Sequence, residues 1–346
     1  MRVLVTGAAG RIGVHLTQAL VREGHEVRAF VLPGDPRTDL IVGPGVELTP
    51  GRLEDADALR AAVRGVEAVY HLAGALTSRG NSDDEFFEFN LRGTFNLLTA
   101  VRDHAPNVRR FAYASSDAVY AAAPGTPACY LPIDEAHPCR PGSIYGASKV
   151  GAEELCLTFW RAYGIPATIL RFGATADADE LVDPRSVFAR WLFLRAAIDL
   201  AAIVPDPTPA HAKALAILRG LDDGTERLVI LADEQGNPEI RHWGDARDVA
   251  AGCLAVLDRP AADGEAFNLA GAAPFSAAEL VCHIAARTGY EYVTARLPTA
   301  RVPWHLSNAK ARGLAGYAPT RTVFDMVDEA VDAQRARIDA SPAETG

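Results

Sequence analysis

Short apolar runs alternate with helical patterns over the first half of the chain. Residues 2–6 form a continuous apolar run, which is typical of a strand covered on both faces. Helices are predicted where apolar positions recur every three or four residues. The predicted strands are 2–6, 26–31, 46–49, 68–72, 110–115 and 167–172, and the predicted helices are 11–22, 55–64, 83–104 and 143–163. This alternation predicts an α/β fold, a doubly wound parallel sheet with helices on both faces.

A glycine-rich turn, TGAAGRIG, joins the first strand to the first helix, and its glycines recur every three residues. Gly7 permits a tight turn, Gly10 lets the backbone approach a pyrophosphate, and Gly13 allows close packing of helix on strand. The helix start, which includes Arg11 and Ile12, offers N–H donors and a positive dipole end to phosphate oxygens. The pattern predicts a dinucleotide site in a Rossmann-type sheet.

The regular alternation of strand and helix patterns ends after Phe172. Residues 174–226 are rich in alanine and mostly helical in pattern, and strand signals return later. We expect a dinucleotide-binding domain followed by a smaller, mostly helical C-terminal substrate domain. The predicted boundaries are 1–172 for the first domain, with 227–270 returning to it, and 173–226 with 271–340 for the second.

The end of the second strand bears on the choice between NAD and NADP, because an acidic residue there bonds the adenosine ribose of NAD. Here that position is Val31, and no arginine replaces it to hold a 2′-phosphate. Asp35 and Arg37 follow in a loop, and either can serve. We expect NAD, since a phosphate needs a cation more than a hydroxyl needs a carboxylate, with NADP as the alternative.

Tyr145 and Lys149 are four residues apart near the start of a predicted helix, so both side chains lie on one helical face. A lysine cation beside a tyrosine favours the phenolate and is expected to lower the pKa of the phenol. Such a pair moves a proton to or from a substrate hydroxyl while a nicotinamide moves the hydride. Ser116 directly follows the predicted strand 110–115 at the same sheet edge, where its hydroxyl can hold the substrate oxygen.

These motifs, in this order, resemble those of one family. From about residue 1 to 335 the chain is similar to the extended short-chain dehydrogenases/reductases, the NAD-dependent epimerase/dehydratase family. The matching motifs are TGAAGRIG at 6–13, HLAG at 71–74, N-x-x-G-T-x-N at 90–96, SSDAVY at 115–120, YGASK at 145–149, and later LRF, RDVA, FNLAG and SNAKA. The resemblance implies Tyr145 as acid/base, Lys149 as its partner and ribose ligand, and Ser116 as oxyanion holder, with Asn90 near the cofactor. The further cofactor contacts that it implies are Leu53, Leu72, Ala73, Gly74 and Phe172.

The family includes epimerases, dehydratases, reductases and decarboxylases. Sugar dehydratases of the family place Asp and then Glu after the serine, whereas here Asp117 is followed by Ala118, which disfavours dehydration. Asp117 stays a candidate substrate contact. Nucleotide-sugar members hold the diphosphate with arginines, and the corresponding positions here are Arg241, Arg296 and Arg301.

The predicted function is therefore a nicotinamide-dependent oxidoreductase or epimerase acting on a hydroxyl or keto carbon of a sugar or nucleotide sugar. The alternative is an NAD(P)-dependent carbonyl or 3-hydroxy reductase for a smaller or more apolar substrate. A cofactor-binding regulator without turnover is a third class, which the intact Tyr145–Lys149 pair opposes.

Composition excludes several other classes. The 346 residues carry 34 Lys and Arg against 44 Asp and Glu, a net charge of −10 without a basic run, so no nucleic-acid partner is expected. The most apolar stretch, 187–204, is interrupted by charged residues and does not predict a membrane span. The five cysteines fit neither a zinc site nor a complete disulfide set, and no signal peptide is evident, so we expect a cytoplasmic protein without a metal.

The two helices predicted over 83–104 and 143–163 carry more apolar residues than one sheet contact requires. Left in water, this surface would form a patch of the size that marks an interface. Two-fold pairing of these helices would bury it, which predicts a homodimer. The alternative is that the alanine-rich segment after Phe172 folds back over them within one chain.

Overall fold

A computed structural model describes residues 1–76, 80–120, 128–204, 207–299 and 303–340. The described residues divide into two compact units. The first unit draws on Met1–Thr175, Ala246–Ala270 and Leu306–Pro319, and the second on Ala176–Asp245, Gly271–His305 and Thr320–Gly346.

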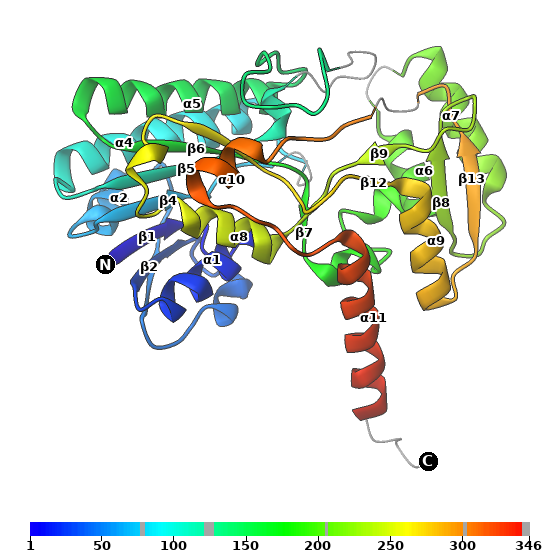
Figure 1. Cartoon of the computed structure of the whole chain (residues 1–346), viewed down its shortest axis with the longest axis horizontal. Coiled ribbons are helices and arrows are strands. Elements are labelled where there is room, and N and C mark those ends of the chain that lie inside the picture. The colour runs from blue at the N-terminus through cyan, green and yellow to red at the C-terminus, as the bar shows by residue number, and fades with distance from the viewer. Residues whose placement is uncertain (77–79, 121–127, 205–206, 300–302, 341–346) are drawn as a thin grey trace. The chain divides into compact units, whose positions relative to one another are not determined.

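The first unit is built on a parallel sheet. In the part of the chain that the structure describes, seven strands run in the order β11-β6-β5-β4-β1-β2-β3 (Figure 1). They are β1 (Arg2–Thr6), β2 (Glu26–Val31), β3 (Val46–Pro50), β4 (Ala68–His71), β5 (Arg110–Ser116), β6 (Ala167–Phe172) and β11 (Ala266–Leu269). The strand order reverses at β1, and such a reversal places ligands at the carboxyl edge of the sheet. The predicted Rossmann-type fold is confirmed.

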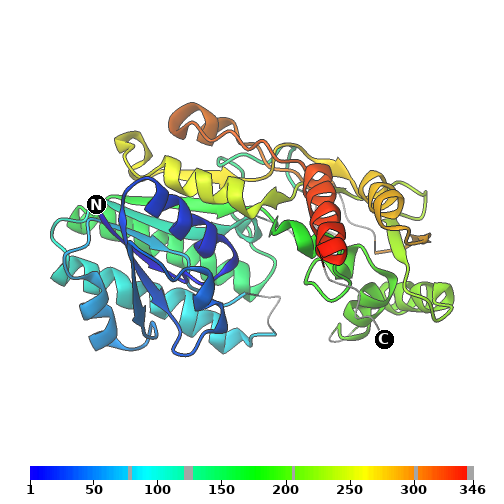
Figure 2. The same cartoon turned by 90° about the horizontal axis from the view of Figure 1, so that it is seen from below.

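Helices cover both faces of this sheet, with α1 and α8 side by side on one face and α2, α4 and α5 on the other (Figure 1, Figure 2). Their bounds are α1 (Arg11–Arg22), α2 (Ala56–Val63), α4 (Gly93–His104), α5 (Ile144–Tyr163) and α8 (Ala246–Ala255), with α10 (Ala309–Ala315) and the short turns η1 (Pro36–Leu40), η4 (Asp117–Val119) and η7 (Pro260–Ala262). Side chains alternate along a strand, so Val3 and Val5 of β1 join the core beneath α1 and α8, and Leu4 joins the core beneath α2, α4 and α5.

The helix predicted over 83–104 is interrupted. It consists of α3 (Asp83–Glu85), the π-helical segment η3 (Phe86–Arg92) and α4. Ser82 caps α3, and its hydroxyl and Glu85 form a capping box. A π-helical turn bonds residues five apart and is often found at functional sites. Here it buries Phe86 and Asn90.

The second unit combines helices with short two-stranded pairings. β8 (Leu228–Ala232) runs parallel to β13 (Tyr292–Arg296), and β9 (Ile240–Arg241) runs antiparallel to β12 (Phe275–Ser276). Its helices are α6 (Leu194–Ala202), α7 (Pro209–Leu221), α9 (Ala277–Thr288) and α11 (Val323–Ala340), with the turns η5 (Ala178–Leu181) and η6 (Ala189–Trp191). The remaining short strands are β7 (Thr175–Ala176) and β10 (Gly244–Asp245). None of the helices described is long and apolar enough to cross a membrane.

The domain boundaries differ from the prediction in two segments, one of which is Leu306–Pro319, predicted in the second domain and found in the first unit. Residues 227–270 were expected to return to the first domain. The structure places residues 246–270 in the first unit and residues 227–245 in the second. The reason is that β8 forms its ladder with β13.

Candidate active site

The glycines shape the turn between β1 and α1. Gly7 has a φ of +69°, and its N–H donates to the carbonyl of Phe30 at the end of β2 (3.0 Å). A Cβ at Gly13 would lie 2.2 Å from the carbonyl oxygen of Gly7, so α1 packs on the turn more closely than any other residue would allow. Among the described residues, a Cβ at Gly10 would have one neighbour within 4 Å, the same carbonyl oxygen at 3.0 Å.

The start of α1 suits an anion. Gly10 caps the helix without a side chain, and the first turn, which begins with Arg11 and Ile12, contains no acidic residue. Backbone N–H groups and the helix dipole favour negative charge at such an end. The space next to Gly10 and this helix end together fit the pyrophosphate of a dinucleotide.

The residues that follow β4 lie beside this turn. The N–H of Leu72 donates to the carbonyl of Thr6 (3.1 Å), and the N–H of Ala73 donates to the Thr6 hydroxyl (3.2 Å). A Cβ at Gly74 would lie 2.6 Å from Oδ1 of Asn90. Because Gly74 has no side chain, the segment that follows β4 can pack directly against Asn90.

Two further predicted cofactor contacts are placed by the sheet and by α4. Leu53 follows β3 and packs against Gly93, where a Cβ would lie 2.9 Å from the leucine side chain. Phe172 is the last residue of β6 and pairs in register with Ser116. Phe172 thus reaches the same sheet edge as Ser116, whereas Leu53 is held by α4.

At the end of β2, Val31 is buried and offers no group to a ribose. The Asp35 carboxylate accepts the N–H of Arg37 (2.9 Å) and so caps η1. This carboxylate has a local role in its own turn. The structure therefore places no carboxylate of β2 at the expected ribose position.

A directed hydrogen-bond chain runs through His71. The Thr94 hydroxyl donates to the carbonyl of Asn90 (2.6 Å), so His71 donates to Thr94 through Nε2 (3.0 Å) and accepts the Thr6 hydroxyl at Nδ1 (2.8 Å). Burial, reinforced by the charge of Lys149, lowers the pKa of His71 to about 3. The neutral ring therefore links the end of β1 to Asn90 and is not a proton donor near pH 7.

Asn90 joins two segments of the site. Its Oδ1 accepts the N–H of Ala75 (2.7 Å), and its Nδ2 donates to the hydroxyl of Ser148 (3.0 Å). That hydroxyl donates in turn to the carbonyl of Tyr145 (2.7 Å). Buried in the π-helical segment, Asn90 fixes the start of α5 against the segment after β4.

The start of α5 is docked on the end of β5. Ser143 caps the helix by accepting the N–H of Gly146 (3.1 Å), and a Cβ at Gly146 would lie 2.3 Å from the carbonyl oxygen of Ala118. The hydroxyl of Ser116 accepts the N–H of Ala118 (3.2 Å) and donates to the Asp117 carboxylate (3.3 Å). Close packing thus brings the first turn of α5, which carries Tyr145, next to Ser116 and Asp117.

Tyr145 and Lys149 lie on one face of α5, as their spacing predicts. Nζ of Lys149 donates to the carbonyl of Ala114 in β5 (2.8 Å) and lies 6.0 Å from the ring centroid of Tyr145. The Tyr145 ring meets Phe86 of the π-helical segment edge to face, with centroids 5.6 Å apart. The tyrosine ring is therefore held by packing, and the ammonium is held by a backbone carbonyl.

The expected lowering of the tyrosine pKa is wrong. Burial raises the pKa of Tyr145 to about 12, against a hydrogen bond with Ser116 that lowers it, and the Asp117 charge raises it further. Burial lowers the pKa of Lys149 to about 8, against the charge of Glu153, which raises it. Desolvation is the largest cause of the shift for both groups. At pH 7 Tyr145 carries its proton, and Lys149 is mostly an ammonium.

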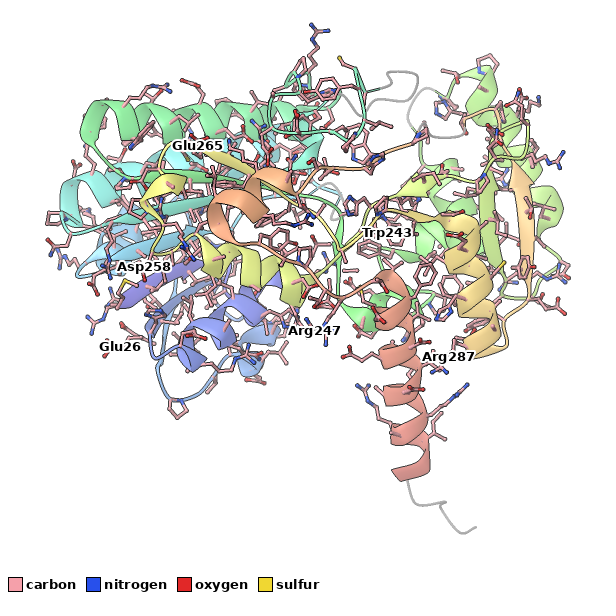
Figure 3. All side chains as sticks on the ribbon, viewed as in Figure 1. Glu26, Trp243, Arg247, Asp258, Glu265 and Arg287 are labelled. Carbon is pink, nitrogen blue, oxygen red and sulfur yellow. The ribbon has the colours of Figure 1, made fainter. Side chains whose placement is uncertain are left out.

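The arginines predicted to hold a diphosphate have different surroundings within the second unit. Arg241 is buried, pairs with Glu239, and lies 5.4 Å from a ring centroid of Trp243, which Figure 3 labels. Arg296 is exposed at the end of β13. Arg301 lies outside the described residues. A diphosphate would be attracted by the positive charge of Arg241. The ion pair with Glu239 neutralises this charge.

Sequence reasoning missed Glu153, one helical turn after Lys149. It is buried, and both of its carboxylate oxygens accept hydrogen bonds from Arg171 of β6 (3.0 and 2.8 Å). The available signal was an acidic residue on the same face of α5 as Tyr145 and Lys149. Its arginine partner lies on the next strand, which spacing alone does not pair with it.

Known proteins resemble this chain in sequence and in fold. The model of the NAD dependent epimerase/dehydratase family matches residues 3–177, about half of the chain. A solved short-chain dehydrogenase/reductase superfamily protein from Agrobacterium tumefaciens, with bound NAD, is 37% identical, with a TM-score of 0.85 over 98% of both chains.

Curated relatives extend the comparison. A UDP-glucose 4-epimerase from Streptomyces lividans is 29% identical over 343 residues, 95% of this chain and 94% of that one. A 4-hydroxy-2-methyl-3-oxo-4-farnesyl-3,4-dihydroquinoline-1-oxide ketoreductase from Stigmatella aurantiaca is 35% identical over 201 residues, 56% of this chain and 58% of that one. The chain spans little more than half the length of several curated relatives that it matches. The chain belongs to the NAD dependent epimerase/dehydratase family and is an NAD-dependent enzyme of the extended short-chain dehydrogenase/reductase type.

Proposed function

We propose that this enzyme interconverts a hydroxyl and a keto group on a sugar or nucleotide sugar, as an oxidoreductase or an epimerase. The observation that carries the proposal is the joining of Tyr145, Ser116 and Lys149 at one sheet edge beside the glycine turn. The epimerase relative from Streptomyces lividans, matched over nearly the whole chain, supports the sugar substrate.

Tyr145 supplies the proton in this proposal. Its raised pKa keeps the phenol protonated at pH 7, so the hydroxyl donates its proton to a carbonyl oxygen during reduction. In the oxidation direction Tyr145 first releases this proton to solvent, and the phenolate then accepts the proton of the substrate hydroxyl. Ser116, which hydrogen-bonds Tyr145, holds the same substrate oxygen. The nearby Lys149 ammonium favours the phenolate while the proton is away. Bound NAD supplies the hydride chemistry.

The residues proposed to hold the cofactor surround this edge. Those at the glycine turn would bind the pyrophosphate through backbone N–H groups. The others would contact the adenosine or the nicotinamide riboside. The proposed set is Gly7, Gly10, Arg11, Ile12, Gly13, Leu53, Leu72, Ala73, Gly74, Tyr145, Lys149 and Phe172.

A second candidate function is reduction of a more apolar ketone. It is favoured by the buried ion pair of Arg241 with Glu239, because a neutralised arginine has little attraction for a diphosphate. The relative from Stigmatella aurantiaca is a ketoreductase and also supports this candidate. Arg241, Arg296, Arg301 and Asp117 stay proposed substrate contacts only under the nucleotide-sugar function.

A substrate screen separates these functions. Purified enzyme is given free sugars, UDP-sugars and apolar ketones with NAD or NADH, and both cofactor absorbance and sugar isomers are measured. The proposed function predicts either a changed cofactor absorbance or an inverted sugar centre with sugar substrates. Turnover confined to apolar ketones would select the second candidate, and turnover of none would contradict both.

The pKa of Lys149 predicts a pH limit. We expect kcat/KM for carbonyl reduction to fall above about pH 8, because the Lys149 ammonium, whose pKa is lowered to about 8, loses its proton there. A pH profile from about pH 6 to about pH 10 measures this limb. Lys213→Met, at an exposed lysine paired with Glu234, should leave the profile unchanged. A profile flat to the alkaline end would contradict the assigned role of Lys149.

We propose that the enzyme is a homodimer that pairs the helical faces of η3, α4 and α5. Three aromatic side chains there remain exposed, Phe87 (48%), Phe95 (46%) and Tyr163 (54%). Sedimentation at micromolar concentration should give twice 36.8 kDa, and Phe95→Glu should give the monomer. Ile203→Glu, at an exposed apolar residue of the second unit, is the control. A parent protein sedimenting as the monomer would contradict the dimer.

A further inference from the structure

Glu153 lies in the interior directly below the proposed proton-transfer groups. It is one helical turn after Lys149 on α5, and its side chain is 7% exposed. Arg171 of β6 donates to one oxygen through Nε (3.0 Å) and to the other through Nη2 (2.8 Å). The hydroxyl of Ser115, the neighbour of Ser116 in β5, donates to Oε1 (2.5 Å).

The network continues beyond Arg171. Nη1 of Arg171 donates to the hydroxyl of Tyr120 (3.0 Å), which donates to Oδ1 of Asn268 in β11 (2.8 Å). Nδ2 of Asn268 donates to the carbonyl of Ile133 (3.1 Å). One chain of hydrogen bonds therefore joins α5, β5, β6 and β11 beneath the catalytic edge of the first unit.

Stability alone is a weak reason for such an ion pair. Burying both charges has a desolvation cost of several kcal/mol for each ion, and apolar replacements of equal volume are often as stable. The position of Glu153 gives a second reason. At a spacing of four residues on one helix, its carboxylate shares a face with the ammonium of Lys149.

Four other titratable groups near Lys149, on β4, β5 and α5, are neutral at pH 7, and Arg171 of β6 is a cation paired with Glu153. His71 of β4 has a pKa of about 3, and the pKa of Tyr145 is about 12. Burial raises the pKa of Tyr113 on β5 and of Cys156 on α5 far above their ordinary values. Glu153 supplies negative charge at this site, and its charge acts against the burial that lowers the pKa of Lys149.

We propose that Glu153 is a positioning residue that, clamped by Arg171 and Ser115, keeps Lys149 in its ammonium form and fixes the end of β5. The first role rests on the proposed function, because it matters only if the ammonium assists Tyr145. The second follows from the contacts of Glu153 alone. Arg171 sets the orientation of the carboxylate, since its two donors occupy both oxygens.

The chain suits a direct test, because Lys149, Lys213 and Lys310 are its three lysines. In protein labelled with ¹³C at the lysine ε carbon, three resonances are expected, and the one that Lys149→Met removes is Lys149. Its midpoint in the parent should lie at about pH 8. In Glu153→Gln it should fall by about one pH unit or more. An unchanged or raised midpoint would overturn the proposal.

Three further variants make the result specific. Glu153→Asp keeps the charge and should restore most of the parent midpoint. Asp263→Asn breaks a different ion pair of the first unit, with Arg110, and should leave the midpoint unchanged. If Glu153→Gln alone fails to fold, Glu153→Gln with Arg171→Met removes both charges, and the midpoint of Lys149 should still fall.

The pH profile of kcat/KM separates this inference from the proposed function. If both hold, the alkaline limb moves to lower pH in Glu153→Gln together with the lysine resonance. A resonance that moves while the limb stays fixed would contradict the role of Lys149 in turnover and leave the electrostatic role of Glu153 intact. A fixed resonance, whatever the activity, would refute the role of Glu153.

Discussion

Replacing Tyr145 with phenylalanine is expected to lower kcat by about 10²- to 10⁴-fold, the range that a positioned acid/base contributes. The reason is that the phenol, with its pKa of about 12, is the proton donor of the account. The ring itself keeps its edge-to-face contact with Phe86, so the fold should be retained. Steady-state kinetics on the substrate found by screening measures the loss.

The matched control for this variant is Tyr163→Phe, which removes a hydroxyl from the exposed end of the same helix. It should retain parental activity. Calorimetry should show that Tyr145→Phe binds NAD and unfolds at nearly the parental temperature. Activity of Tyr145→Phe within a few-fold of the parent would remove this residue from the mechanism.

Replacing Gly10 with valine is expected to abolish NAD binding. A branched side chain there would enter the space next to the start of α1 that the pyrophosphate would occupy, at an estimated loss of about 100-fold or more in affinity, near 3 kcal/mol. Since a Cβ at Gly10 meets the Gly7 carbonyl oxygen at 3.0 Å and no other described atom within 4 Å, the fold itself should tolerate the change. Isothermal titration with NAD measures the loss.

Gly13→Ala gives the contrasting outcome. Its Cβ would lie 2.2 Å from the carbonyl oxygen of Gly7, so α1 must move away from the turn. This variant should lower the free energy of unfolding by a few kcal/mol, in the range of an overpacked core site. Unchanged NAD affinity in Gly10→Val would show that the glycine turn has a packing role only.

The strands of the first unit were predictable because a strand buried on both faces is a continuous apolar run. The runs 2–6, 26–31 and 167–172 have the same bounds in the structure. The π-helical break at Phe86–Arg92 was not predictable, because the apolar residues of this seven-residue segment recur at spacings of three and four, which also fit an α-helix. The pairing of β8 with β13 joins strands about sixty residues apart, and local patterns do not specify such partners.

The spacing of four residues correctly predicted that Tyr145 and Lys149 lie on one face of a helix, because residues four apart share a helical face. The direction of the tyrosine pKa was wrong because desolvation depends on the surrounding tertiary structure. For the same reason the sequence did not reveal that Arg171, from a neighbouring strand, would hold Glu153. The sequence also did not show that Glu239 would neutralise Arg241.

The central claim is that the enzyme moves a hydride at one carbon of its substrate while Tyr145 moves the proton of the attached oxygen. Substrate deuterated at that carbon, incubated with enzyme and NAD in ordinary water, tests this directly by mass spectrometry. The account predicts that the deuterium appears on the nicotinamide or returns to the same carbon of an inverted product, and that Tyr145→Phe slows both. Deuterium released to water from that carbon, or left in place while product forms, would contradict it.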